Sequence, residues 1–165
     1  RFGWLLINLL TAIMASLVIS LFDATIQQIV ALAILMPIVA SMGGNADTQA
    51  LTVAVRALAM REVSNINSFR VIWKETIVGA LNGVAFAVII GVVTFFWFKN
   101  TELAIIIAVA MIINLIVAGL FGAGIPIFLN RIGSDPAISS TVILTTVTDV
   151  IGFLIFLGLA ATFLI

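Results

Sequence analysis

Long uninterrupted runs of apolar residues limit what this chain can fold into more than any other feature. Five such runs follow one another, and each reaches the roughly 20 residues that a helix needs to cross a bilayer. Membrane β-strands would alternate apolar and polar residues instead, and these runs are continuous. We therefore expect an all-α integral membrane protein of the cell inner or plasma membrane. Its residues 1–165 would form one transmembrane domain with helices at about 2–22, 26–60, 71–98, 103–129 and 137–165.

The composition narrows the class of function. Hydrophobic residues make up 64% of the chain and charged residues 8%, whereas soluble domains are about one quarter charged. The absence of cysteine and histidine removes disulfides, thiol chemistry and histidine bases or ligands. The net charge of zero gives no sign of nucleic-acid binding. The sequence has no nucleophile–base pair and no phosphate-binding loop, so we do not expect an enzyme. As a membrane protein, the chain would have lipid as its surroundings.

The basic residues predict an orientation. With five spans, six of the seven Lys and Arg residues fall on the side of the N-terminus, and only Lys99 falls on the other side. Cytoplasmic loops are enriched in Lys and Arg. We therefore expect a cytoplasmic N-terminus and an extracytoplasmic C-terminus, with Lys74 and Glu75 at the inner interface.

One carboxylate stands deep in the last apolar run. Asp149 has no Lys or Arg within two turns, and an ionisable residue at such depth is a candidate functional group. Three threonines precede it at helical spacing, so that one polar stripe ends in the carboxylate. Water or a cation would satisfy such a stripe. The alternatives are a structural aspartate and threonines that bond only to their own helix. The stripe consists of Thr141, Thr145, Thr148 and Asp149.

A second polar stripe interrupts the second apolar run, within the segment MGGNADTQ. Its members recur at the spacing of one helix face, at a depth similar to that of Asp149. The preceding Gly43 and Gly44 would let another backbone approach, and would loosen the helix to expose carbonyl groups. Taken alone, the glycine pair also fits a simple helix-packing notch. We expect Gly44 and this stripe to line a water-filled path: Asn45, Thr48, Gln49 and Thr52.

The donor atoms indicate the solute. Carboxylate, hydroxyl, amide and carbonyl oxygens suit hard cations, so Mg²⁺ is expected, with Mn²⁺ or Ca²⁺ also compatible. Asp23, after the first run, is placed to attract cations at the outer mouth, although a solvated loop or capping role fits it equally well. A single Asp149 is little charge for a divalent ion, and two-fold symmetry would supply a second.

The chain resembles the transmembrane domain of the MgtE magnesium channels over essentially its whole length. The resemblance implies a homodimer with five helices per subunit and a pore between the second and fifth helices. It implies that Asp149 holds a largely hydrated Mg²⁺, that Thr145 offers its carbonyl, and that Asn45 and Thr48 face the pore. It also implies cytoplasmic regulatory domains before the first helix. The residues that carry it are Gly43-Gly44-Asn45 with Gln49, Arg56 to Arg61, Ile125-Pro126, Asp135-Pro136 and Thr146 to Val150.

Asp47 departs from the family pattern, which has glycine there. It lies about 200° around the helix from Asn45, so we do not expect it in the central stripe. Three functions stay open at this point. The favoured one is a channel that conducts Mg²⁺ into the cytoplasm down its electrochemical gradient. The others are a secondary transporter coupled to Na⁺ or H⁺, and a scaffold whose polar stripes only hold helices together.

Overall fold

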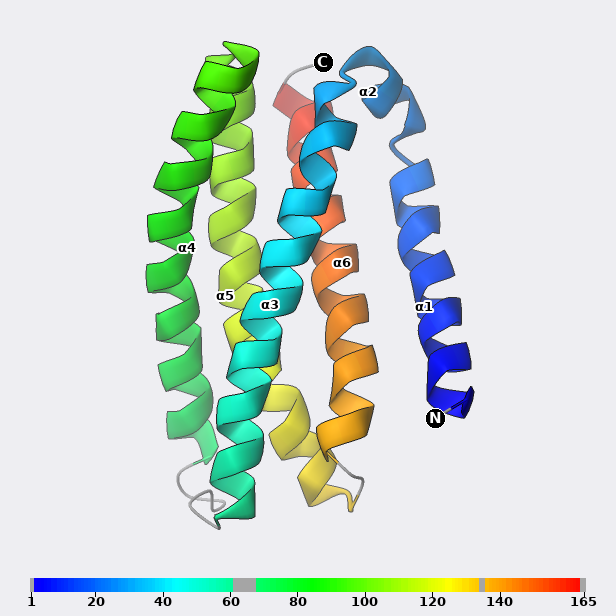
Figure 1. The fold of residues 1–165 in the computed structure, drawn as a ribbon, viewed down its shortest axis with the longest axis vertical. Helices are drawn as coiled ribbons and strands as arrows, with labels where there is room; N and C mark the ends of the chain where they lie inside the picture. The colour runs from blue at the N-terminus through cyan, green and yellow to red at the C-terminus, as the bar shows by residue number, and fades with distance from the viewer. Residues whose placement is uncertain (1, 61–67, 134–135, 164–165) are drawn as a thin grey trace.

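The chain folds into a bundle of helices (Figure 1). The computed structural model describes residues 2–60, 68–133 and 136–163, with backbone alone for 136–140, and no strand occurs in these ranges. The expectation of an all-α protein is confirmed. The helices are α1 (Phe2–Ser20), α2 (Asp23–Gln28), α3 (Ala31–Ala59), α4 (Ser68–Phe98), α5 (Thr101–Arg131) and α6 (Pro136–Phe163).

Four of these helices are long and apolar enough to cross a membrane, namely α1, α4, α5 and most of α6. The 29-residue α3 is not among them, because the polar segment around Asn45 and Asp47 lowers its hydropathy. The second expected span, 26–60, also differs at its start. There the chain forms the separate short helix α2, which crosses between α1 and α3 in Figure 1.

Helix α5 forms the centre of the bundle. In the most apolar stretch of α5, 56% of the residues are buried, whereas in that of α1 only 6% are. Helix α1 lies at the edge of the bundle beside α6. α4, α3 and α6 all pack against α5, and α3 also packs against α6. The core gathers large side chains from these three contact partners and from α5 itself, including Leu35, Ile107, Met111, Phe156 and Leu157.

Two glycines let α4 and α5 pack almost backbone to backbone. A Cβ atom added at Gly79 would overlap the carbonyl oxygen of Leu115, and one at Gly119 would overlap that of Glu75. Small residues at such crossings let membrane helices approach closely, and van der Waals contact then holds them together. The neighbouring Gly83 repeats the pattern against Ile112. Helices α4 and α5 therefore form one closely packed unit.

The turn between α4 and α5 has recognisable local causes. Lys99 adopts a positive φ of 52°, which reverses the chain within two residues. Asn100 then caps α5, since its Oδ1 accepts a hydrogen bond from the backbone N–H of Leu103 (3.2 Å). At the opposite end, the guanidinium of Arg131 donates to the hydroxyl of Ser68 (2.8 Å) and ties the end of α5 to the start of α4.

The outer surface of the bundle is apolar. Leu17, Leu81, Val88 and Phe96 are each more than 60% exposed, as expected for side chains that face lipid.

Three residues used in the sequence analysis lie outside the described ranges. Arg1 and Arg61 were used to predict the orientation, and Asp135 was used for the family resemblance.

Candidate ion site between α3 and α6

The polar segment of α3 is helical throughout. α3 continues without interruption through Pro37 and through Gly43 and Gly44. The expectation that the glycine pair loosens the helix is therefore wrong for this structure. The two glycines instead differ in their surroundings. A Cβ at Gly43 would lie 2.5 Å from Nδ2 of Asn114 on α5, whereas a Cβ at Gly44 would meet nothing within 4 Å.

All four members of the α3 stripe are exposed: Asn45, Thr48, Gln49 and Thr52. The hydroxyls of Thr48 and Thr52 donate to the carbonyls of Gly44 and Thr48 (both 2.8 Å), so both bond back to their own helix. Their oxygen lone pairs remain directed outward from the bundle, where they can accept hydrogen bonds from water.

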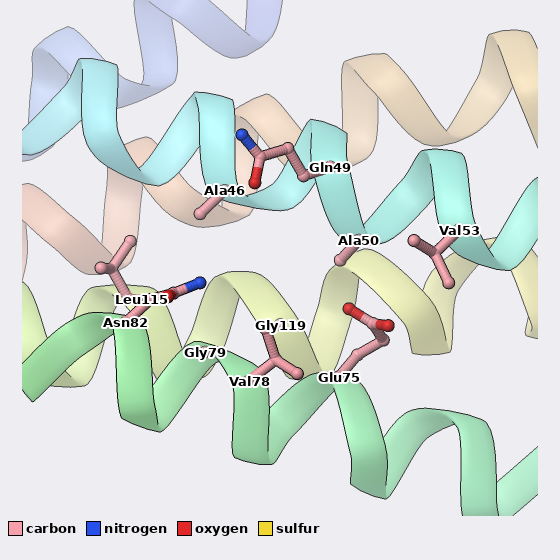
Figure 2. Close-up of a pocket in the computed structure, with 10 residues that line it drawn as sticks. All are labelled: Ala46, Gln49, Ala50, Val53, Glu75, Val78, Gly79, Asn82, Leu115 and Gly119. Carbon is pink, nitrogen blue, oxygen red and sulfur yellow. The ribbon is translucent and has the colours of Figure 1, made fainter.

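Gln49 lies in a different environment from the rest of the stripe. It lines a cavity of about 190 Å³ between α3 and α4, to which Leu115 and Gly119 of α5 also contribute. Figure 2 shows Gln49 on α3 facing Asn82 and Glu75 on α4, with the carboxylate of Glu75 pointing toward α3. Glu75 is only 8% exposed, because α4 packs closely on α5 at this point.

On α6, the candidate residues are spread around the helix. Thr141 is exposed, Thr145 and Asp149 are partly exposed, and Thr148 is buried. The hydroxyl of Thr145 donates to the carbonyl of Thr141 (2.9 Å), which is the local bond that the alternative interpretation predicted. Asp149 lies one turn further along, so Thr145 and Asp149 share one face of α6.

A carboxylate–hydroxyl contact joins α3 and α6 at this level. The hydroxyl of Thr148 donates to Oδ2 of Asp47 at 3.1 Å, and both residues are almost completely buried, at 1% and 2% exposure. The carboxylates of Asp47 and Asp149 lie within electrostatic reach of each other. The contact shows that α3 and α6 pack side by side at the level of Asp47 and Thr148.

Asn114 is a buried polar residue that the sequence argument did not single out. It is 0% exposed in the middle of α5, and its amide donates to the carbonyl of Val39 on α3 (3.1 Å). Gly43 on α3 and Gly152 on α6 leave the space for its side chain. A lone amide inside an otherwise apolar run was the available signal, since such residues are costly in a membrane.

Asp23 lies away from this seam. It is the first residue of α2 and is exposed, and its Oδ2 accepts a hydrogen bond from Nε2 of Gln27 (3.1 Å). Figure 1 places α2 at the end of the bundle where α3 begins and where α4 turns into α5. The expected position at one mouth of the bundle is compatible with this placement.

The described residues offer few charges but many oxygen atoms. No group of three or more His, Cys, Asp or Glu gathers within them. Hydroxyl, amide, carbonyl and single carboxylate oxygens can instead accept hydrogen bonds from the water around a hydrated cation. The α3–α6 seam is therefore chemically suited to a cation that keeps its hydration shell.

Comparison with known proteins agrees with these features. Residues 36–159 match the model of the family MgtE, described as a divalent cation transporter. The chain is 34% identical to the magnesium transporter MgtE of Bacillus subtilis and 32% identical to that of Enterococcus faecalis, with 99% of the chain covered in both. It is 34% identical to that of Thermus thermophilus over 97% of its length.

The chain spans about a third of the length of these relatives, namely 36%, 36% and 35%. The match to the family model nevertheless covers most of α3, all of α4 and α5, and most of α6, with the candidate residues of α3 and α6. The resemblance drawn from the residue motifs is thereby confirmed. With four long apolar helices and a family match over most of its residues, this chain is a multi-pass protein of the cell membrane and belongs to the MgtE family of divalent cation transporters.

Proposed function

We propose that this chain is the ion-conducting part of a homodimeric Mg²⁺ channel. Five helices of each subunit, α1 and α3 to α6, would cross the membrane, and α3 and α6 of both subunits would line the pore. Asp149 would attract a hydrated Mg²⁺, together with the Thr145 carbonyl and the side chains of Asn45 and Thr48. Gly44, Gln49, Thr52 and Thr141 would complete the wall of the path, and Thr148, which is 1% exposed, would support it from between α3 and α6.

The observation that carries the proposal is the contact between Asp47 and Thr148. It joins α3 and α6, the two helices that carry the polar stripes, between residues about a hundred positions apart in the sequence. The oxygen donors of that seam suit Mg²⁺, which gives up its water reluctantly and binds through few protein ligands. The magnesium transporters that the chain resembles support the same ion.

A second copy of the chain would solve a problem that the single chain leaves. Asn45, Thr48 and Thr52 are exposed on a long helix packed within an otherwise apolar bundle. Polar side chains that face lipid are unfavourable, and they normally face a bundle interior or a water-filled cavity. A two-fold axis beside α3 and α6 would cover them and would place two Asp149 carboxylates around one path.

The membrane potential alone would drive entry. A doubly charged ion that crosses 100 mV gains about 4.6 kcal/mol, so an inside-negative cell would accumulate Mg²⁺ without a coupling ion. The distribution of Lys and Arg supports a cytoplasmic N-terminus. The greater length of the relatives leaves room for further domains, and we propose that cytoplasmic ones regulate the pore.

A transporter that exchanges the cation for Na⁺ or H⁺ is the second candidate. That alternative assumed that the second span is a broken helix, which would form the binding site of an alternating-access transporter. The unbroken course of α3 through Gly43 and Gly44 removes that support. The continuous helix favours a path over an alternating exchange site.

The deciding experiment measures Mg²⁺ uptake by liposomes that contain the purified protein, under an imposed inside-negative potential. The wild type should take up Mg²⁺, and Asp149→Asn should lose most of the uptake. Glu102→Gln, at an exposed carboxylate on α5 outside the seam, is the matched control and should conduct like the wild type. Undiminished uptake by Asp149→Asn would refute the site.

The same liposomes separate the channel from the exchanger and the scaffold. Uptake by a channel should follow the potential and should not change when the Na⁺ or H⁺ gradient is reversed at fixed potential. Dependence on either gradient would instead establish the exchanger. A scaffold would pass no Mg²⁺ and would gain no thermal stability from it. Competition by Mn²⁺ and Ca²⁺ in this assay would rank the three ions.

A further inference from the structure

Asp47 has no role in the function proposed above, and its contacts give it one. Its carboxylate accepts the Thr148 hydroxyl at 3.1 Å on one oxygen and the Thr48 hydroxyl at 3.3 Å on the other. The Thr48 hydroxyl has a shorter bond of 2.8 Å to the Gly44 carbonyl. Because a hydroxyl has one hydrogen, the contact with Thr148 is the more important one for Asp47.

The surroundings fix Asp47 in place. A Cβ atom at Gly122 on α5 would lie 2.9 Å from the backbone oxygen of Asp47 and 2.6 Å from the side chain of Ala50. α3 therefore rests directly on the backbone of α5 at this level. Since α5 holds α3 from one side, the bond from Thr148 to Asp47 determines how closely α6 approaches from the other.

The positions next to this bond are those of the proposed ion site. On α3, Asn45 and Thr48 flank Asp47 by two residues and one residue. On α6, Asp149 follows Thr148 directly and Thr145 precedes it by nearly one turn. Thr48 and Asp149 each lie about 100° around their helix from the bonded residue, and Asn45 lies about 200° around α3 from Asp47. Because the bond joins the two helix backbones at this level, a change in it would shift these positions on α3 relative to those on α6.

The Thr148 hydroxyl has other acceptors within reach. The backbone carbonyls of Leu144 and Thr145 lie 3.0 and 3.3 Å from it, so its single hydrogen is shared between Leu144 and Asp47, which are almost equally near. If Asp47 were replaced by an apolar residue, the hydroxyl would keep a partner inside α6. The loss would then fall on the connection between the helices and not on the satisfaction of a buried polar group.

We propose that Asp47 and Thr148 form a positioning pair that sets the distance between the two halves of the ion site and so selects Mg²⁺ against Ca²⁺. This inference rests on the proposed function. Mg²⁺ holds an octahedral water shell of fixed size, whereas Ca²⁺ accepts six to eight ligands in flexible geometries. A site of fixed width discriminates between the two ions, and a looser one tolerates the larger ion.

The test compares the ratio of Ca²⁺ to Mg²⁺ uptake in liposomes for a set of variants. Thr148→Val removes the hydroxyl at almost constant volume, and Asp47→Ala removes the acceptor. Each should raise the ratio roughly fivefold, the scale on which contacting residues are coupled. The double variant should show no greater rise than either single one, because the same bond is lost in all three.

Two further variants separate positioning from charge and from general damage. Asp47→Asn keeps an oxygen acceptor without the charge, and it should restore most of the discrimination lost in Asp47→Ala. Thr146→Val removes a neighbouring hydroxyl that bonds within α6 to the Val142 carbonyl (2.9 Å), and it should leave the ratio unchanged. Thr148→Val and Asp47→Asn are close in shape to the native residues, so they decide the matter should Asp47→Ala fail to fold.

Each outcome bears on the inference. If Asp47→Asn shifts the ratio as much as Asp47→Ala while Thr148→Val does not, Asp47 acts through its charge and the positioning pair is refuted. An unchanged ratio in both Asp47→Ala and Thr148→Val refutes it as well, and leaves the proposed channel standing if Asp149→Asn still abolishes uptake. A wild type that passes no Mg²⁺ would refute the channel itself.

Discussion

The side-chain amide of Asn114, in the centre of α5, donates a hydrogen bond over 3.1 Å to the backbone carbonyl of Val39 on α3. Gly43, one turn after Val39, leaves the space that this amide occupies. A polar bond in the middle of an apolar bundle fixes how two helices sit against each other, since the Asn114 amide alone would be an unsatisfied donor in hydrocarbon.

This arrangement predicts opposite effects for the two neighbouring glycines. Gly43→Ala would put a methyl group 2.5 Å from Nδ2 of Asn114, so the amide must leave its bond to Val39 or the helices must move apart. We expect a loss of about 1–3 kcal/mol in stability, the usual cost of overpacking. Thermal unfolding in detergent measures it.

Gly44→Ala is the control for that prediction. A Cβ at Gly44 meets nothing within 4 Å, and alanine is about 1 kcal/mol better than glycine inside a helix. The variant should unfold at the same temperature as the wild type or higher. Equal destabilisation by the two substitutions would show that Asn114 does not occupy the place given to it here.

A second pair of glycines predicts a larger effect. Gly79→Ala and Gly119→Ala would each drive a methyl group into a backbone carbonyl of the facing helix, at Leu115 and Glu75. Backbone cannot turn aside as a side chain can, so α4 and α5 must separate along their contact. We expect losses of at least about 2–3 kcal/mol, or failure to fold.

Gly158→Ala on α6 provides the comparison, because a Cβ there meets nothing within 4 Å. The yield of folded protein after detergent extraction, measured by size-exclusion chromatography with thermal unfolding, should fall for the first two variants and not for the third. Normal stability of Gly79→Ala would contradict the close crossing of α4 and α5.

The sequence predicted the helices better than it predicted their contacts. Long continuous apolar runs identify α1, α4, α5 and α6, since few other structures bury such runs. The start of the second run was wrong, because nothing in its composition marks the separate helix α2 (Asp23–Gln28). The polar stripes were visible from helical spacing, which depends on one helix at a time.

The contacts between helices could not be found in this way. Helical spacing correctly put Asp47 on a different face from the exposed Asn45, but it could not say that α6 covers that face and that Thr148 bonds to it. The burial of Glu75 by the close packing of α4 on α5 was likewise not predicted. Such facts depend on which helix lies beside which.

Asp23 predicts an effect that depends on salt. Its carboxylate is exposed at the start of α2, outside the seam between α3 and α6. An exposed charge attracts ions only within a Debye length, which is about 30 Å at 0.01 M salt and about 3 Å at 1 M. Asp23→Asn should therefore slow Mg²⁺ uptake by liposomes at low ionic strength and have no effect at high ionic strength.

The control for Asp23 is Asp149→Asn, whose loss of uptake should persist at high ionic strength. Charges inside a pore are screened much less than charges on the surface. A salt-independent effect of Asp23→Asn would instead indicate a structural role, for example through its hydrogen bond with Gln27.

The lack of cysteine in the chain allows a direct test of the water-filled path. A cysteine placed at Asn45 or Thr52 should react with a water-soluble maleimide in the membrane, because both positions are exposed on the polar face of α3. Val88→Cys should stay unreactive, since this position on α4 is 63% exposed on the apolar surface and would face lipid. Thiolates form only in contact with water, so lipid-facing cysteines do not react.

Mg²⁺ should slow labelling at Asn45→Cys, which lies beside the proposed ion site. Labelling that is equal at Asn45→Cys and Val88→Cys, or that ignores Mg²⁺, would show that the polar face of α3 does not line the path of the ion.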